Sequence, residues 1–261
     1  MEKIQQALER AKLQREANNT KSTDSRQAQA TDVQSIIYTR TQSVTGHTDL
    51  QRENRILSAM EHSEYADAFK ILSTQVMQRM QEHQWSSLAV TSVGADEGKT
   101  TTAINLGISI AKEIEYTVLL VDANLRKPSI HTYFGIEPEL GLSDYLQSDV
   151  ELADILIRPA DIDHFVILPG GKPVINSTEM LGSPKMCTLV NELKERYPKR
   201  VIIFDLPPVL KTADAVSFVP CIDCALIVVE DDTTKTSELK QTVDLLSVTN
   251  VIGTVLNKAR Y

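Results

Sequence analysis

The sequence of 261 residues lacks the features that mark secreted, membrane-spanning or nucleic-acid-binding proteins. It has three cysteines, and this small odd number argues against a disulfide framework. No apolar run approaches the roughly 18 residues needed to cross a bilayer, and the polar N-terminus does not resemble a secretory signal. The formal net charge of −8 does not favour nonspecific binding to nucleic acid. These absences predict a cytoplasmic protein with no direct membrane span, whose contact with a membrane would come through a partner.

Two of the cysteines, Cys221 and Cys224, form a C-x-x-C pair. No second pair of this kind and no neighbouring histidine accompanies it, and Cys224 leads directly into the apolar run 225–229. We therefore interpret these cysteines as small buried hydrophobic residues rather than as a redox or zinc site.

The chain is long enough for one large α/β domain with an N-terminal helical extension. Residues 1–48 are predicted to form a first helix, over 1–17, followed by a disordered linker that is rich in Asn, Thr, Ser, Gln and Asp. The narrow apolar stripe of that helix would either dock on a partner or be solvated. Residues 49–84 are predicted to form a helical lead-in, in which apolar residues recur every three or four positions from about Ser63 to Glu82.

From residue 85 to residue 261, strand and helix patterns alternate. Strands are expected at 88–92, 117–122, 165–168, 201–205, 224–230 and 251–256. Helices are expected at 100–114, 183–196 and 235–247, with shorter helical pieces at 142–147, 151–156 and 212–218. Alternation of this kind implies right-handed crossovers and a mostly parallel sheet flanked by helices on both faces. The predicted fold class is therefore α/β.

A glycine-containing loop between the first strand and first helix of this domain is the most informative motif. Backbone N–H groups in such a loop, together with the helix N-terminus, bind the oxygens of a triphosphate. Lys99 would reach the β- and γ-phosphates, and the Thr100 hydroxyl would hold Mg²⁺. The usual spacing requires glycine at position 93, where this chain has Val93, so a simple turn with a solvated lysine is the alternative. The candidate nucleotide-binding residues are Gly94, Ala95, Asp96, Glu97, Gly98, Lys99, Thr100 and Thr101.

Two further apolar strands end in carboxylates, Asp122 and Asp205. In a parallel sheet, ligands bind at the carboxyl ends of the strands, where these side chains would meet the phosphate loop. Mg²⁺ prefers hard oxygen ligands. The sequence therefore predicts Thr100, Asp122 and Asp205 as metal ligands and Lys99, Asp122 and Asp205 as catalytic residues. Taken singly, each aspartate could instead be a turn or helix-cap residue.

The motifs and their order along the chain resemble those of the bacterial tyrosine kinases that use a P-loop fold. The partitioning ATPases share this fold. Within that group the chain looks most like the exosortase-associated tyrosine autokinases of exopolysaccharide gene clusters. The stretches that carry the resemblance include 97–106, 118–128, 141–146, 168–171, 181–184, 204–208 and 253–258.

The resemblance implies an ATP-dependent protein-tyrosine autokinase that regulates exopolysaccharide biosynthesis or export, with ATP and Mg²⁺ as cofactors. Asp122 would orient or deprotonate the acceptor tyrosine hydroxyl, and Asp205 would hold the metal. Asn257 would hydrogen bond the adenine, or else be an ordinary strand-end residue. The implied partners are an inner-membrane polysaccharide chain-length regulator that activates the kinase, and further copies of the chain itself.

The sequence also departs from this family at three places. Asn124 stands where the family usually has a second aspartate, which removes a negative charge beside the metal. Many relatives end in a cluster of tyrosines, whereas here Tyr261 alone closes the chain and Tyr38 is another possible acceptor. A family motif that builds a ring of subunits is replaced at its three positions by Asp67, Lys70 and Ser73.

Two other functions therefore stay open. A partitioning-type ATPase switch shares the fold, but its signature lysine would stand at Gly94. The second alternative is a catalytically weakened, nucleotide-bound scaffold, and Asn124 is the main residue that favours it.

Overall fold

The computed structural model describes residues 42–45, 48–57, 60, 63–113, 115–196 and 199–259. The chain separates into two compact units, Met1–Ile37 and Tyr38–Tyr261, and every described residue belongs to the second. The predictions for the helix at 1–17, for Tyr38 and for Tyr261 lie outside the described residues.

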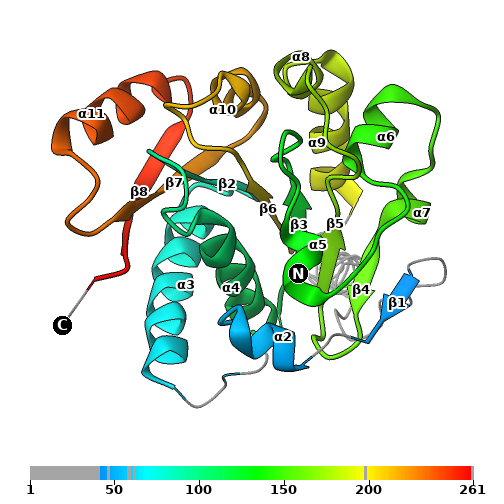
Figure 1. The fold of residues 1–261 in the computed structure, drawn as a ribbon, viewed down its shortest axis with the longest axis horizontal. Helices are drawn as coiled ribbons and strands as arrows, with labels where there is room; N and C mark the ends of the chain where they lie inside the picture. The colour runs from blue at the N-terminus through cyan, green and yellow to red at the C-terminus, as the bar shows by residue number, and fades with distance from the viewer. Residues whose placement is uncertain are drawn as a thin grey trace, which may run out of the picture. The chain divides into compact units, whose positions relative to one another are not determined.

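The second unit is built on an eight-stranded sheet (Figure 1). The strand order is β1-β4-β5-β3-β6-β2-β7-β8, and neighbouring strands are parallel except for the antiparallel pair β4 and β5. This confirms the prediction of a mostly parallel sheet. The strands are β1 (Gln42–Val44), β2 (Ser87–Ser92), β3 (Thr117–Asp122), β4 (Ile157–Pro159), β5 (Phe165–Leu168), β6 (Arg200–Asp205), β7 (Cys224–Glu230) and β8 (Asn250–Asn257).

Helices cover both faces of the sheet, because alternate residues of the central strands point to opposite sides. In β2, Leu88 and Val90 pack into one core and Ala89 into the other. The first core lies under α3 (Glu64–Glu82), α4 (Lys99–Ala111) and α5 (Ile130–Phe134), and α2 (Thr48–Glu53) contacts α5. The second lies under α6 (Leu142–Gln147), α7 (Leu152–Ile155), α8 (Ser177–Leu181), α9 (Pro184–Arg196), α10 (Asp214–Phe218) and α11 (Thr236–Leu245).

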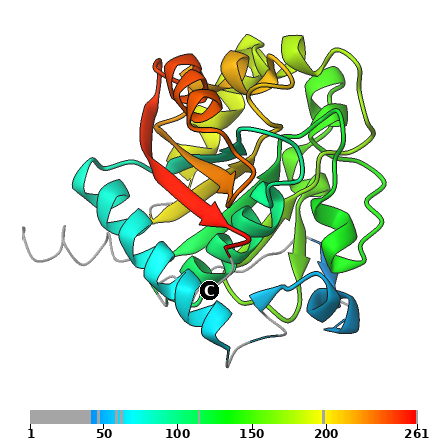
Figure 2. The same cartoon turned by 60° about the vertical axis from the view of Figure 1, so that its left-hand side comes forward.

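Helix α3 begins where the sequence predicts, because Ser63 caps it. The Ser63 side chain accepts a hydrogen bond from the Ala66 N–H at 3.2 Å. Phe69, Val76 and Met80 are buried on one stripe of the helix, which packs against α4. Figure 2 shows α3 in cyan as a long helix and the edge strand β8 in red.

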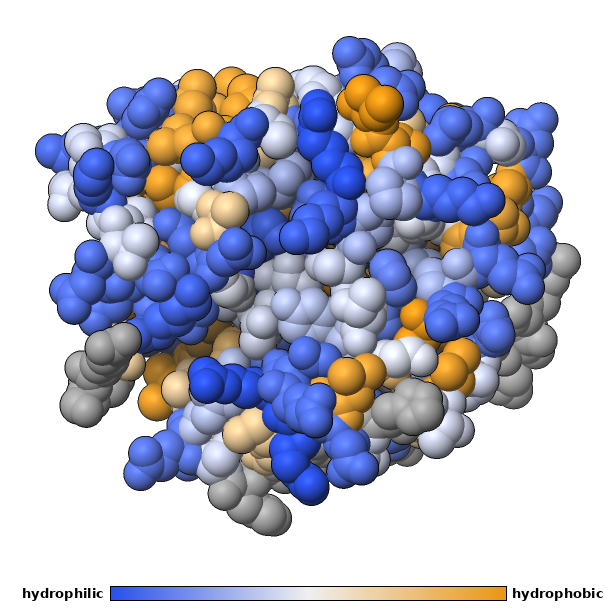
Figure 3. All heavy atoms as spheres, viewed as in Figure 1, coloured by the Kyte–Doolittle hydropathy of each residue, from blue (hydrophilic) through white to orange (hydrophobic). Residues whose placement is uncertain are grey.

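At the sheet edge, β8 and α11 are less completely buried than the central elements. Val243, Leu245 and Val248 are exposed by 38%, 40% and 65%. In the face shown in Figure 3, apolar side chains gather at the upper left, where Figure 1 places α11.

The prediction for the cysteines was wrong for Cys221, which is joined to Cys187 by a disulfide. The sequence spacing could not reveal this pairing, because the two residues are 34 positions apart and meet where α9 contacts the 3-10 helix η3 (Val219–Cys221). Cys224 is a buried free thiol, and burial raises its pKa to about 12. It therefore behaves as the predicted small core residue.

The linker prediction was also wrong over residues 42–44, which form β1 beside β4. This strand has three residues and is largely exposed, so it carries no apolar pattern by which the sequence could show it. The backbone pairing with β4 defines it instead.

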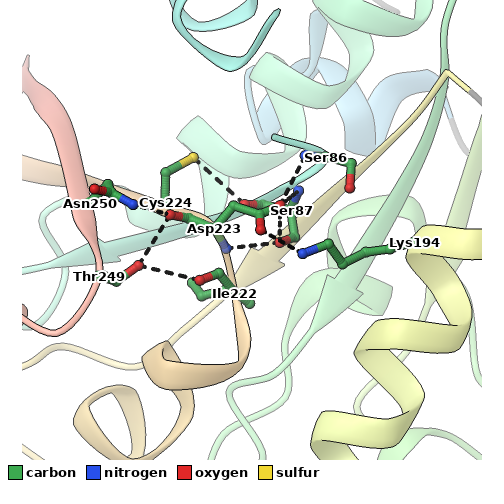
Figure 4. Close-up of polar contacts among 8 residues, drawn as sticks. All are labelled: Ser86, Ser87, Lys194, Ile222, Asp223, Cys224, Thr249 and Asn250. Atoms are coloured by element: carbon green, nitrogen blue, oxygen red, sulfur yellow. Dashed lines mark hydrogen bonds and ion pairs between the residues drawn. The ribbon is translucent and has the colours of Figure 1, made fainter. Parts of the chain in front are cut away.

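At the opposite end of the strands from the phosphate loop, Asp223 joins β2, β7 and α9 (Figure 4). Its Oδ2 accepts hydrogen bonds from the N–H groups of Ser86 and Ser87, both at 3.0 Å, and from Ser87 Oγ at 2.8 Å. Lys194 of α9 donates to its Oδ1. Burial acts to raise the pKa of Asp223, but these hydrogen bonds outweigh it and hold the pKa below its ordinary value. The network fixes the register of β2 against β7.

Candidate active site

The phosphate loop runs from the end of β2 to the start of α4, and Gly98 allows its final turn. Gly98 has φ of 90°, a left-handed conformation that disfavours other residues. A Cβ at this position would lie 2.0 Å from Asn257 Nδ2. Asn257, at the end of β8, donates from that same Nδ2 to the Glu97 carbonyl at 2.8 Å. The last strand therefore anchors the loop, and the predicted role of Asn257 toward adenine stays a prediction.

The Glu97 side chain braces the loop from within. Its Oε2 accepts a hydrogen bond from the Gly94 N–H at 2.9 Å, and its Oε1 accepts one from Thr234 Oγ1. Ser92 Oγ donates to the Gly94 carbonyl at 2.7 Å. Val93, which replaces the usual glycine, is 2% exposed and packs into the core. The departure from the usual spacing is thus accommodated by turning this side chain inward.

Lys99, Thr100 and Asp205 meet at the start of α4. Thr100 Oγ1 donates to Asp205 Oδ2 at 2.7 Å, and Lys99 Nζ lies 3.6 Å from Asp205 Oδ1. Asp205 is fully buried, and its Oδ1 has no hydrogen-bond partner in the described part of the chain. A buried carboxylate oxygen without a hydrogen bond is costly. The site therefore has an unused oxygen ligand beside a hydroxyl and an ammonium group.

Asp122 is the neighbour of Asp205 across the sheet, since the two residues pair in the register of β3 and β6. Its Oδ2 accepts the N–H groups of Ser129 at 2.8 Å and Ile130 at 2.9 Å. Burial, and then the charge of Asp205, raise its pKa to about 7. Burial also raises the pKa of Asp205, although Lys99 and Thr100 oppose the shift.

The donor set of Thr100, Asp122 and Asp205 fits a hard divalent cation such as Mg²⁺. Among the described residues no group of three or more His, Cys, Asp or Glu side chains is arranged for a metal. Mg²⁺ usually keeps several waters and takes phosphate oxygens as ligands, so two carboxylates and a hydroxyl suffice.

A cavity of about 1120 Å³ opens beside this group. Seven of the predicted binding residues line it, while Gly94 and Glu97 shape the loop from behind and Asp122 and Asp205 lie buried beneath it. The seven are Ala95, Asp96, Gly98, Lys99, Thr100, Thr101 and Asn257. Asn124 also lines the cavity, and its N–H lies 3.3 Å from Asp122 Oδ1.

Sequence reasoning missed the part of the cavity wall that comes from the lead-in. Arg55 and Tyr65 line the cavity, and a buried side chain of α4 holds this segment in place. Asn105 Oδ1 accepts the Leu57 N–H at 3.0 Å, and its Nδ2 donates to the Arg55 carbonyl at 2.9 Å and to the Tyr65 hydroxyl at 3.1 Å. In the sequence, the feature that could have indicated this contact is Asn105, a single asparagine within the apolar face of the helix that follows the loop.

The sequence also missed Arg126 and Thr212, which line the cavity from the segments after β3 and β6. Arg126 stands in the stretch 118–128 that carries the family resemblance, but the sequence assigned it no role, and Thr212 stands in none of the stretches that carry the resemblance.

Comparison with known proteins first defines the class. Residues 88–261 match the family model of the CobQ/CobB/MinD/ParA nucleotide binding domain, which agrees with the phosphate loop and the parallel sheet. The chain is a member of this nucleotide-binding class.

Relatives and solved structures then define the family. Tyrosine-protein kinase YwqD of Bacillus subtilis (strain 168) is 30% identical over 196 residues, which cover 74% of this chain and 80% of that protein. A putative tyrosine-protein kinase in the cps region of Klebsiella pneumoniae is 29% identical over 193 residues, or 73% of this chain and 26% of that protein. The kinase domain of the Escherichia coli tyrosine kinase ETK superposes with a TM-score of 0.72 at 25% identity, covering 78% of this chain and 81% of that domain. The chain belongs to the family of bacterial tyrosine-protein kinases.

This membership confirms the predicted fold class and the predicted enzyme class, protein-tyrosine kinase. The helices of the described residues include none with the length and apolar character needed to cross a bilayer.

Proposed function

We propose that the chain is an ATP-dependent tyrosine autokinase that acts in exopolysaccharide biosynthesis or export. The observation that carries the proposal is the meeting of Lys99, Thr100 and Asp205 beside Asp122 at the end of the parallel strands. A relative in a cps region supports the link to polysaccharide synthesis.

In the proposed reaction, Lys99 and the loop N–H groups bind the γ-phosphate of ATP and stabilise the charge that develops on it. Thr100, Asp122 and Asp205 would hold Mg²⁺, which neutralises phosphate charge when it is bound. The acceptor tyrosine oxygen forms a bond to the γ-phosphorus, while the bond from that phosphorus to the bridging oxygen of ADP breaks. Asp122 orients the tyrosine hydroxyl and takes its proton, and the burial that raises its pKa to about 7 in the metal-free chain makes it a stronger base.

The proposed partners are an inner-membrane polysaccharide chain-length regulator and further copies of the chain. The kinase would work in the cytoplasm, where ATP is available, and would reach the membrane through that regulator. Assembly through α3 would differ from the ring-building motif of the family. Asp67 and Lys70 form an exposed ion pair at 3.0 Å, and Ser73 is buried with its Oγ 2.9 Å from Ser109 Oγ.

A weakened kinase that serves as a nucleotide-bound scaffold is the second candidate. Asn124 favours it, because this amide lines the cavity next to Asp122 at a position where a carboxylate would add a metal ligand. A partitioning-type ATPase switch would hydrolyse ATP and dimerise without phosphorylating protein.

The test is to incubate the purified chain with Mg·ATP, with and without the cytoplasmic tail of the regulator, and to map phosphotyrosine by mass spectrometry. Lys99→Ala is the inactive control, and Asn124→Asp distinguishes a weakened kinase from a scaffold. We expect phosphotyrosine in the native chain and more of it in Asn124→Asp. ATP binding without phosphotyrosine in either protein would refute the kinase and leave the scaffold, while ADP release without phosphotyrosine would favour the ATPase switch.

A further inference from the structure

A buried carboxylate fixes Arg126 at the wall of the cavity. Arg126 Nε lies 3.2 Å from Asp214 Oδ2, and its Nη2 lies 3.4 Å from Asp214 Oδ1 and 3.3 Å from Thr178 Oγ1. A guanidinium carries five N–H donors, two of them on Nη1. Among the residues that the structure describes, the Nη1 donors have no hydrogen-bond partner. The side chain is 41% exposed, so these two donors are open to a ligand.

Asp214, the first residue of α10, is itself held from the other side. It is fully buried and accepts hydrogen bonds from Ser177 Oγ at 2.7 Å and from Thr178 Oγ1. Because α8 fixes the carboxylate, the carboxylate fixes the plane of the Arg126 guanidinium.

Thr212 lies two residues before Asp214 and also lines the cavity. Its Oγ1 is buried and has no hydrogen-bond partner within the described ranges. A buried hydroxyl in this state costs free energy, which a ligand with a suitable oxygen would recover.

The nucleotide phosphates have their own ligands in Lys99 and the loop N–H groups. Arg126 and Thr212 come instead from the segments after β3 and β6, and Arg126 is tied through Asp214 to α10 and α8. A planar guanidinium with free donors matches the oxygens of a phosphate group better than a lysine does. A second phosphate group therefore fits this part of the cavity.

We propose that Arg126 and Thr212 form a subsite for the phosphorylated tyrosine that the reaction produces, with Asp214 as the positioning residue for Arg126. The inference rests on the proposed function, because it takes phosphotyrosine as the product. Arg126 and Thr212 bind the phosphate oxygens, and Asp214 acts on binding through the orientation of Arg126.

The experiment titrates a short phosphotyrosine peptide into the full chain in the presence of Mg·ADP and measures binding by calorimetry. We expect Arg126→Ala to weaken peptide binding by about 10- to 100-fold, as for the loss of charged hydrogen bonds. Arg126→Lys should not restore binding, because lysine lacks the planar guanidinium group with several N–H donors. Lys211→Ala removes an exposed charge next to Thr212 and should change binding less than about twofold.

Positioning is tested by a double-mutant cycle. Asp214→Asn should weaken peptide binding, and it should add little in the Arg126→Ala background because both changes remove the same interaction. Ser177→Ala provides a milder variant if the melting temperature of Asp214→Asn falls. Affinity for a non-hydrolysable ATP analogue should stay within about twofold of the native value in all these variants.

Binding of the product requires no turnover, so the outcomes separate the two proposals. A native chain that binds the peptide through Arg126 but forms no phosphotyrosine would count against the kinase function alone. The subsite is refuted if the native chain does not bind the peptide. It is also refuted if Lys211→Ala weakens peptide binding as much as Arg126→Ala does, or if Arg126→Ala weakens binding of the ATP analogue as much as it weakens binding of the peptide. Additive effects in the cycle would refute the positioning role.

Discussion

Replacement of Gly98 by alanine tests whether the last strand sets the shape of the phosphate loop. Gly98 has φ of 90°, and a Cβ there would lie 2.0 Å from the Asn257 amide nitrogen. That nitrogen is not free to move without loss, because it donates to the Glu97 carbonyl at 2.8 Å. Alanine must therefore accept a strained backbone and also displace the anchor of the loop.

The expected cost follows from these two effects. A non-glycine residue in the left-handed region costs about 1–2 kcal/mol. Loss of the hydrogen bond between Asn257 and Glu97 costs a further 0.5–1.5 kcal/mol or so. These costs add to about 1.5–3.5 kcal/mol, and because the loop must hold this conformation to bind the phosphates, they correspond to a loss of roughly 10- to 400-fold in ATP affinity.

Calorimetric titration with a non-hydrolysable ATP analogue and Mg²⁺ measures this loss. Gly94→Ala is the matched control, since its Cβ would meet Glu97 Oε1 at 3.3 Å and the effect should stay below about fivefold. Asn257→Ala removes the obstructing group, so the double variant Gly98→Ala/Asn257→Ala should bind the analogue no more weakly than Gly98→Ala alone.

Unchanged affinity in Gly98→Ala would refute this reasoning about the loop. If Asn257 contacts the adenine instead, Asn257→Ala alone should lose affinity and the double variant should be weaker than either single variant. The same four proteins therefore decide between the anchoring role of Asn257 and the role predicted from the sequence.

Three further predictions concern stability, local opening and pH. Asp223→Ala should lower the free energy of unfolding by about 2–4 kcal/mol at pH 7, with exposed Asp49→Ala as control. Because the pKa of Asp223 is lowered in the folded state, its contribution to the free energy of unfolding is present above the unfolded pKa and is lost as pH falls through the folded pKa. Urea titrations in which the native chain stays more stable than Asp223→Ala by the same amount in acid would contradict this. Asn105→Leu should speed hydrogen exchange at 55–57 far more than elsewhere, since it leaves buried backbone groups unpaired; equal change throughout would argue against a local clamp. Phosphotyrosine formation should decline as pH falls and Asp122 becomes protonated, at a pH below the pKa of about 7 that it has in the metal-free chain, because bound Mg²⁺ favours the carboxylate. A rate that stays flat throughout the acid range in which the chain is folded would exclude Asp122 as the base.

Much of the fold and part of the site could be predicted because their signals are local. The apolar runs that form β2, β3, β6 and β7 stand out in the sequence, since strands at the centre of a parallel sheet are buried on both faces. Asp122 and Asp205 were found by their place at the ends of such strands. Because ligands bind at this edge of a parallel sheet, the sequence predicted that both aspartates lie next to the phosphate loop that carries Lys99.

The sequence was less informative where a short element depends on a neighbour. Strand β1 has no pattern of its own and exists through its pairing with β4. The five-residue helices α5 and α8 were not predicted, because each is defined by its packing in the fold rather than by an apolar periodicity of its own.

The amino-acid sequence by itself determined the class of fold, the phosphate loop and the two strand-end carboxylates, because each depends on residues adjacent in the chain. Tertiary structure alone decided that β3 lies beside β6 and so pairs Asp122 with Asp205, that Asn257 anchors a loop 160 residues away, and that Cys187 meets Cys221. It also placed Asp214 behind Arg126. These contacts join residues distant in sequence, and the order of the strands and the paths of the connections between them fix which of those residues meet.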